Sequence, residues 1–108
     1  MLTNGVRALE ALGDPTRRAL FESLARGPRA VGELAEIAGV SSSAVSQHLK
    51  VLRAARLVMV RARGNHRMYS LDPRGLGAAR DYLDQYWPSA LAAYSAALAE
   101  AAPDSELG

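Results

Sequence analysis

Apolar residues recur every three or four positions along most of the chain, and this spacing predicts a mainly helical fold. Asp14 and Ser41 can each cap a following helix, because a side-chain oxygen accepts a hydrogen bond from a free backbone amide. Gly39 permits the left-handed conformation that commonly ends a helix. The expected helices run to about residue 12, from Pro15 to about 27, over 31–38, from Ser42 to about 53, and onward from about 73.

The third and fourth of these helices, joined by a short turn at 38–41, predict a helix-turn-helix. Val45, Leu49 and Leu52 share one face of the fourth helix, and we expect this face to pack on the core. The opposite face carries side chains that form hydrogen bonds or bear a positive charge: Ser42, Ser43, Ser46, Gln47, Lys50 and Arg53. This pattern is typical of a helix that reads DNA in the major groove.

Two β-prone segments, 58–62 and 67–71, flank a Gly-Asn turn and predict a β-hairpin. Pairing across the turn places Val60 opposite Tyr69 on the face toward the core. The other face collects Met59, Arg61, Arg63, His66 and Met68. A helix-turn-helix followed by such a hairpin predicts the fold class, which is mainly α with a small β-hairpin wing, a winged helix-turn-helix.

The apolar pattern from residue 73 onward is longer than one small domain needs for its own core. Its members are Leu76, Ala79, Leu83, Tyr86, Trp87, Leu91, Tyr94 and Leu98. Pro88 lacks an amide hydrogen and disfavours helical geometry at Trp87, so we expect a kink or a break there. We interpret residues 1–102 as a single domain that includes dimerisation helices, and residues 103–108 as a flexible tail.

Composition fits one small domain and excludes cysteine chemistry. The chain has 108 residues, of which 49% are hydrophobic, enough for one modest core. It has no cysteine, so disulfides, a thiolate nucleophile and cysteine-ligated metals are excluded. The first residues do not match a secretory signal peptide, and no apolar run reaches the length of a transmembrane helix. We therefore expect a cytoplasmic protein with no membrane partner.

The net charge of +2 hides an uneven distribution along the chain. Residues 50–71 contain six lysine or arginine residues and no acidic residue, whereas the segments before and after are neutral and acidic. Gln47 can pair with adenine through two hydrogen bonds, and Lys50 and Arg53 are placed to meet phosphates. The wing adds three cations for the minor groove or for phosphates: Arg61, Arg63 and Arg67. The predicted partner is double-stranded DNA.

One small domain covers only a few base pairs, so specific binding favours two copies on a two-fold operator. The terminal helices supply the candidate dimer interface: Leu2, Val6, Leu9, Tyr82, Tyr86, Trp87, Leu91 and Tyr94. One alternative is that some of these side chains belong to the core of the chain itself. Another is a protein-interaction module of the same fold. A third is a pocket for a small-molecule inducer near the aromatic residues of this set.

The sequence carries no motif for catalysis. We find no nucleophile with an adjacent base, no phosphate-binding glycine loop and no credible pair of catalytic carboxylates. His48 lies beside Leu49 on the recognition helix, and a half-buried or phosphate-facing histidine explains it better than a catalytic base. We therefore expect neither enzyme activity nor a cofactor, and we place His48 among the candidate DNA-binding residues.

Several blocks of this sequence resemble the arsenic-repressor (ArsR/SmtB) family of winged-helix regulators, with their spacing intact from about Leu9 to Trp87. The blocks are DPTR at 14–17, VGELA at 31–35, VSQHLKVL at 45–52, LV at 57–58 and GNHRMY at 64–69. The resemblance implies a homodimer that is joined by its first and last helices and represses promoters by occupying them. Arg56 stands where the family often has glycine, so it would either strain the turn or alter a phosphate contact.

Some members of the family that this chain resembles have metal sites, and this chain lacks the ligands of those sites. Metal sensors of the family place cysteines on the third helix, where this chain has ELAEI at 33–37. The other family site uses Asp and His ligands on the last helix. Both histidines, His48 and His66, precede that helix, and Asp81 and Asp84 therefore have no histidine partner. We expect no bound metal, because zinc favours nitrogen and sulfur ligands.

Overall fold

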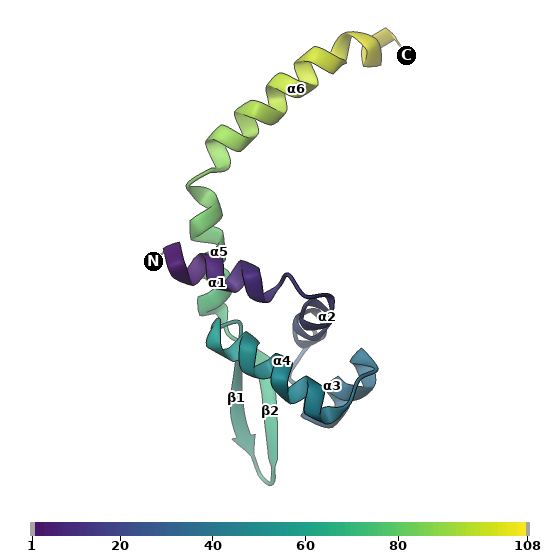
Figure 1. Cartoon of the computed structure of the whole chain (residues 1–108), viewed down its shortest axis with the longest axis vertical. Coiled ribbons are helices and arrows are strands. Elements are labelled where there is room, and N and C mark those ends of the chain that lie inside the picture. The colour runs from purple at the N-terminus through teal and green to yellow at the C-terminus, as the bar shows by residue number, and fades with distance from the viewer. Residues whose placement is uncertain (1, 108) are drawn as a thin grey trace.

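The described chain consists of six helices and one two-stranded antiparallel hairpin (Figure 1). This computed structural model describes the backbone of residues 2–107 and the side chains of residues 4–101. The elements are α1 (Leu2–Ala11), α2 (Pro15–Leu24), α3 (Val31–Ala38), α4 (Ser42–Ala54), β1 (Val58–Arg63), β2 (His66–Leu71), α5 (Pro73–Asp84) and α6 (Trp87–Leu107). Their order confirms the predicted fold class.

Hydrogen bonds on both sides fix the turn between α3 and α4. Gly39 adopts φ +69°, and its amide donates to the Ala35 carbonyl oxygen at 2.9 Å, which closes α3. The Ser41 hydroxyl accepts from the Ala44 amide at 3.0 Å and so caps the start of α4. Both helix ends predicted at this turn are confirmed. The first turn of α4 therefore has a defined position relative to α3.

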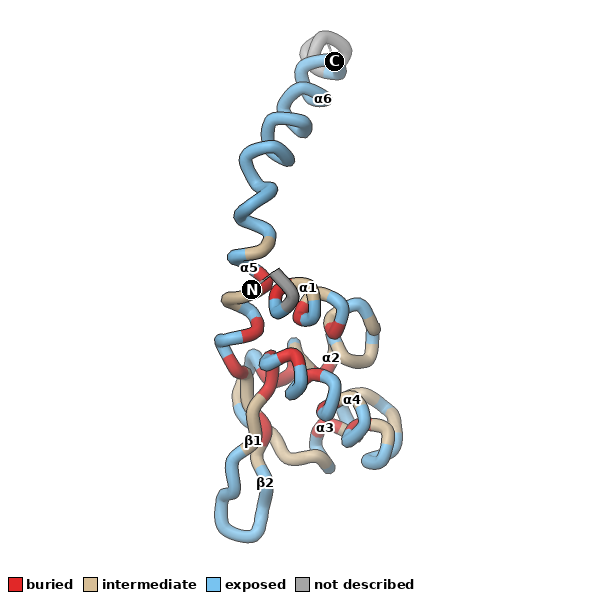
Figure 2. The backbone as a smooth tube through the Cα atoms, turned by 60° about the vertical axis from the view of Figure 1, so that its left-hand side comes forward, coloured by how far each residue is buried: buried red, intermediate tan, exposed pale blue. Residues whose placement is uncertain are grey.

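The hydrophobic core lies beneath α4, between this helix, α2, α3 and the base of the hairpin (Figure 2). Val45, Leu49 and Leu52 are at most 1% exposed, as their helical spacing predicts. Burying a side chain of this size contributes about 1.5–3 kcal/mol, so turning α4 about its axis would cost several kcal/mol. The buried face of α4 therefore decides which of its side chains face outward.

Arginine side chains at the start of α2 cap the end of α1. Arg17 Nε donates to the Ala11 carbonyl oxygen at 2.6 Å, and Arg18 Nη1 donates to the Leu12 carbonyl oxygen at 2.9 Å. The last carbonyls of a helix have no partner within the helix, so these bonds fix the corner between α1 and α2. The Asp14 cap of α2 was predicted and is confirmed at 2.9 Å from the Arg17 amide.

The hairpin pairs in the predicted register and is joined by a third strand-like segment. Val60 lies opposite Tyr69, as expected. The backbone of Arg29, in the loop before α3, pairs with Tyr69 on the free edge of β2, with N–H···O distances of 2.9 and 2.8 Å. This pairing was not predicted, because Arg29 and Tyr69 are far apart in the sequence. It anchors the base of the hairpin to the helix-turn-helix.

A buried carboxylate joins the hairpin to α5. Asp72 is 3% exposed, and it caps α5 by accepting from the Arg74 amide at 3.0 Å. The Arg74 guanidinium donates to both carboxylate oxygens, the shortest distance being 2.7 Å. The Asp72 amide donates to the Leu57 carbonyl oxygen at 3.0 Å. The pKa of Asp72 is lowered, chiefly because the Arg74 side chain donates to its ionised form.

Glycines allow α5 to approach two other elements closely. A Cβ at Gly5 would lie 2.6 Å from the Ala78 carbonyl oxygen, where α1 crosses α5. A Cβ at Gly75 would collide with the carbonyl oxygens of Ala55 and Arg56, in the turn after α4. The start of α5 is therefore pressed against the end of α4, and the middle of α5 against α1.

Helix α6 projects from the rest of the molecule, and its described side chains are exposed along its length (Figures 1 and 2). A break at residues 85–86 separates it from α5, which confirms the interruption predicted near Pro88. The backbone is helical to Leu107, and the flexibility of residues 103–108 stays a prediction. No helix in the described part of the chain is long and apolar enough to cross a membrane.

Replacing Gly75 by alanine should destabilise the protein, because the new Cβ would lie 2.5 Å from the Ala55 carbonyl oxygen and the backbone would have to move. We expect the free energy of unfolding to fall by about 2–3 kcal/mol, measured by urea denaturation. Gly77→Ala, on the same helix, is the matched control. A Cβ at Gly77 would have no atom within 4 Å apart from its chain neighbours and the nearby backbone of α5 itself. This control should gain about 0.5–1 kcal/mol. Equal effects of the two substitutions would contradict the close contact.

Asp72→Asn should weaken the acid sensitivity of folding. The pKa of Asp72 is lower in the folded than in the unfolded chain, so its ionisation stabilises the fold above the ordinary pKa of 3.8. This stabilisation is lost as the pH falls through the folded pKa. Urea denaturation from pH 6 to pH 2 should show a steeper loss of stability for the native chain than for Asp72→Asn. Asp84→Asn controls for the loss of one charge on α5, and parallel curves for Asp72→Asn and the native chain would refute the prediction.

Candidate nucleic-acid interface

The outward face of α4 is a continuous polar surface. Six of the seven predicted DNA-binding side chains of this helix are exposed: Ser42, Ser43, Ser46, Gln47, Lys50 and Arg53. Hydroxyl and amide groups occupy the first two turns, and the two cations occupy the last two. This order matches base reading near the start of a recognition helix and phosphate contacts further along. The structure thus presents the predicted residues on one face of one rigid helix.

His48 differs from its neighbours on α4, because its side chain is half-buried and turned toward α2. Its Nδ1 lies 4.0 Å from Asp14 Oδ2, and the two side chains are 25% and 34% exposed. The pKa of Asp14 is lowered, first because its carboxylate accepts from the Arg17 amide. His48 therefore lies beside an ionised carboxylate at the helix cap. A DNA contact from His48 stays a prediction.

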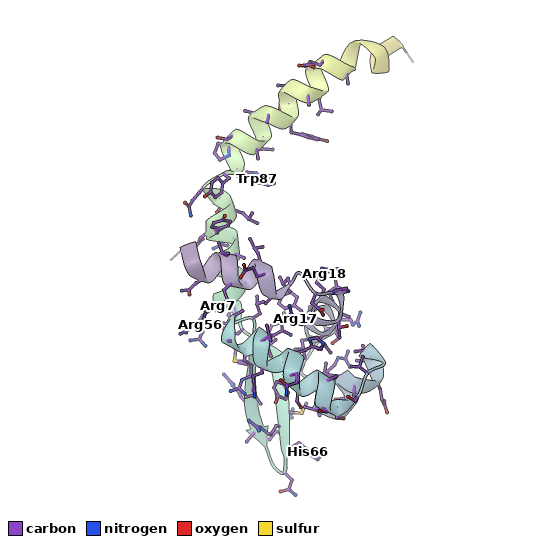
Figure 3. All side chains as sticks on the ribbon, viewed as in Figure 1. Arg7, Arg17, Arg18, Arg56, His66 and Trp87 are labelled. Carbon is purple, nitrogen blue, oxygen red and sulfur yellow. The ribbon has the colours of Figure 1, made fainter. Side chains whose placement is uncertain are left out.

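The hairpin carries its cations outward from the core. Arg61, Arg63 and Arg67 are exposed, and within the described residues none of them forms an ion pair with a carboxylate. The register places Arg61 and Arg63 on the outer face, whereas Arg67 pairs with Ala62 on the other face. Figure 3 shows the turn, with His66 beside it, as the far end of the molecule from α6. The three guanidinium groups thus surround the hairpin rather than line one side of it.

Apolar side chains on α5, on α6 and at the break between them remain exposed, as the surplus in the sequence predicts. Tyr86, Trp87, Leu91 and Tyr94 are 51%, 55%, 46% and 64% exposed. The predicted residues Val6, Leu9 and Tyr82 are partly buried, and the side chain of Leu2 lies outside the described residues. The Tyr82 and Tyr86 rings are 5.3 Å apart, and the pKa of Tyr82 is raised by the neighbouring Tyr86 phenol.

An apolar groove of about 320 Å³ runs between α1 and α5, next to these exposed side chains. Leu76 and Leu83 line it and are 47% and 44% exposed. Both belong to the apolar pattern found in the sequence, yet neither was among the predicted interface residues. Spacing alone could not separate them from core positions such as Ala79, which is buried. Trp87, the first residue of α6, also lines the groove and so joins it to the start of α6.

Metal ligands do not gather in the described part of the chain. No group of three histidine, cysteine, aspartate or glutamate side chains lies close enough to hold an ion among the described residues. Of the acidic residues on α5, Asp81 pairs with Arg80 at 3.7 Å. The exposed hydroxyl, amide and guanidinium groups of α4 and the hairpin suit contacts with a polyanion.

Comparison with known proteins points to one family. A model of the family described as "Bacterial regulatory protein, arsR family" matches residues 14–60, from the cap of α2 to the middle of β1. This chain is similar to the HTH-type transcriptional regulator Rv2034 of Mycobacterium tuberculosis. The two are 58% identical over 89 residues, which cover 82% of this chain and 83% of that protein.

Solved structures give the same result. The crystal structure of a possible transcriptional regulator for arsenical resistance is 45% identical, with a TM-score of 0.67 over 74% of this chain and 83% of that one. A solution structure from Mycobacterium bovis is 25% identical, with a TM-score of 0.62 over 90% of this chain and 84% of that one. It is described as a homodimeric winged helix-turn-helix DNA-binding domain of a possible ArsR-family regulator. By sequence and fold, this chain belongs to the arsR family of bacterial regulatory proteins.

Proposed function

We propose that this transcriptional regulator is a repressor that binds a two-fold symmetric operator as a homodimer. In this proposal α4 enters the major groove, and the hairpin lies on the minor groove or on phosphates. An operator on the bacterial chromosome makes the cytoplasm its place of action. Occupying a promoter is sufficient for repression, so the proposal requires no catalytic group, cofactor or metal.

The observation that carries this proposal is the rigid polar face of α4 beside the unpaired cations of the hairpin. Three core side chains fix the rotation of α4, so the polar face is ready before DNA arrives. The hairpin arginines have no carboxylate partner in the described structure, so phosphates need not displace one. A preordered surface limits the entropy lost on binding. A protein-interaction module of the same fold would not need a polar face on α4 together with unpaired arginines on the hairpin.

The second part of the proposal is a dimer formed through α1, α5 and α6. Exposed apolar surface of this extent marks interaction sites in proteins. The groove between α1 and α5 reaches the start of α6 at Trp87, and in this proposal one partner covers both the groove and α6. We assign this surface to a second copy, supported by the homodimeric description of the Mycobacterium bovis domain. A small-molecule inducer near the same aromatic residues stays a prediction.

Ser46→Ala combined with Gln47→Ala should abolish sequence specificity. Each protomer loses two base contacts, and a good base contact is worth about 1–3 kcal/mol of discrimination. We expect the ratio of specific to random-DNA affinity to fall at least about 100-fold. The measurement is a gel shift on a site selected from randomised duplexes by the native protein. If selection enriches no sequence, or if the double variant keeps the ratio, the assignment of α4 is wrong.

A matched variant with glutamine at Arg61, Arg63 and Arg67 separates phosphate contacts from base reading. If each protomer neutralises about 4 phosphates, log affinity against log salt has a slope near −7 for the dimer. The hairpin variant should make this slope clearly shallower, whereas the α4 double variant should leave it unchanged. An unchanged slope in the hairpin variant would exclude the hairpin from the DNA contact.

Leu91→Glu should weaken the dimer, because two copies of an apolar contact on α6 are replaced by buried charges. We expect the dimer dissociation constant to rise at least about tenfold, measured by sedimentation equilibrium. Ala96→Glu is the control, because at 100° per residue it lies on the opposite face of α6. A native chain that is monomeric at micromolar concentration, or equal effects of the two variants, would contradict this interface.

A further inference from the structure

A second cluster of cations lies at the other end of α4 from its serines. A recess of about 220 Å³ opens between α1, the turn after α4 and the first turns of α5. Asn4 and Arg7 line it from α1, Arg56 from the turn, and Arg74 and Gly75 from α5. Figure 3 shows Arg7 and Arg56 on the same side of the molecule, above the base of the hairpin. None of the residues that line this recess is among the predicted DNA-binding residues.

The recess carries an excess of positive charge. Arg74 is neutralised by Asp72, which lies buried behind it. Arg7 and Arg56 are exposed, and their side chains form no hydrogen bond or ion pair within the described residues. Glu10 lies one turn further along α1 and does not pair with Arg7. The lining therefore holds three cations and no carboxylate, and Asp72 behind it is the nearest compensating charge, paired with Arg74 and also interacting electrostatically with Arg56.

The backbone of Arg56 has an unfavourable conformation, which is held in place by α5. Its φ is +59°, and it is the only residue other than glycine with a positive φ in the described chain. The Gly75 amide donates to the Arg56 carbonyl oxygen at 2.7 Å, which holds the turn. A glycine would fit this backbone without strain. Strain of this kind tends to occur at functional sites. An arginine at a position that glycine would fit better therefore indicates a role for its side chain.

Size and electrostatics narrow the class of ligand. The recess is smaller than the roughly 300 Å³ at which pockets for drug-sized ligands begin, so it suits a small ion or one charged group. The start of α5 contributes the positive end of a helix dipole, whereas the end of α4 contributes a negative one. These two effects oppose each other. Attraction must therefore come from the arginines, which bind oxyanions through several parallel hydrogen bonds.

We propose that this recess is a binding site for a small oxyanion, either inorganic phosphate or the phosphate or carboxylate group of a small metabolite. Arg7 and Arg56 pair with its oxygens, and the Asn4 amide donates a further hydrogen bond. The anion links α1 to the end of α4 and the start of α5. It therefore joins the recognition helix to the helices that expose the apolar surface, where an effector can influence both.

A phosphate of the DNA backbone is the competing occupant. Two features favour the free anion. The site is a recess of about 220 Å³ that is lined by residues of α1, of the end of α4 with its turn, and of α5, so one small anion can contact all three. It also lies about 20 Å from the start of α4, because 13 residues rise 1.5 Å each. The serines that are placed to read bases lie at that distant end.

The test measures anion binding by the full chain without DNA, so it does not depend on the repressor proposal. Isothermal titration calorimetry measures the binding of inorganic phosphate, and thermal unfolding measures the Tm in its presence. Sodium chloride of equal ionic strength is the reference. The variants are Arg56→Gly, which keeps the backbone conformation, and Arg7→Gln. Arg26→Gln, an exposed arginine at the end of α2, is the matched control.

We expect saturable phosphate binding and a Tm rise of at least about 3 °C at saturation in the native chain and in Arg26→Gln. In Arg56→Gly and Arg7→Gln the affinity should fall at least tenfold. Absence of saturable binding, or equal binding in all four proteins, overturns the proposal. If phosphate does not bind but Arg7→Gln and Arg56→Gly make the salt dependence of DNA binding shallower, DNA is the occupant and the proposal is wrong.

Discussion

The packing of one face of α4 against the core is the contact on which the rest of the structure depends. Val45, Leu49 and Leu52 are removed from water, and their positions fix the rotation of the helix. The polar side chains on the other face are thereby held outward without any hydrogen bond of their own. The proposed surface for DNA thus results from apolar packing, because a helix that buries one face presents the other.

The small interior of the domain explains the apolar surface on α1, α5 and α6. A small domain has little interior in which to bury a long helix, and the described side chains of α6 are exposed along its length. Gly5 lets α1 lie directly on α5, which hides one side of that pair and leaves the other open. The open side of this pair and α6 both expose apolar surface. A second copy can cover such a surface, because two-fold symmetry pairs a surface with itself.

A short segment after α4 connects the proposed functions. The turn at Arg56 begins the hairpin, contacts the start of α5 through Gly75, and lines the cationic recess. Asp72 holds the other end of the hairpin to Arg74. The end of α4, the base of the hairpin and the start of α5 therefore meet within a few residues. An event at this junction reaches all three elements through direct contacts, which is the physical basis for placing an effector site there.

The sequence by itself determined the features that depend on residues close together in the chain. Helix periodicity, the Asp14 and Ser41 caps, the Gly39 turn and the hairpin register follow from local geometry, and the structure confirms them. The exposed polar face of α4 followed as well, because burial of one helix face implies exposure of the other. Only the tertiary structure placed Arg7 beside Arg56 and the Arg29 backbone beside β2. Spacing along a chain shows which residues share a face, whereas packing between distant segments decides what that face meets.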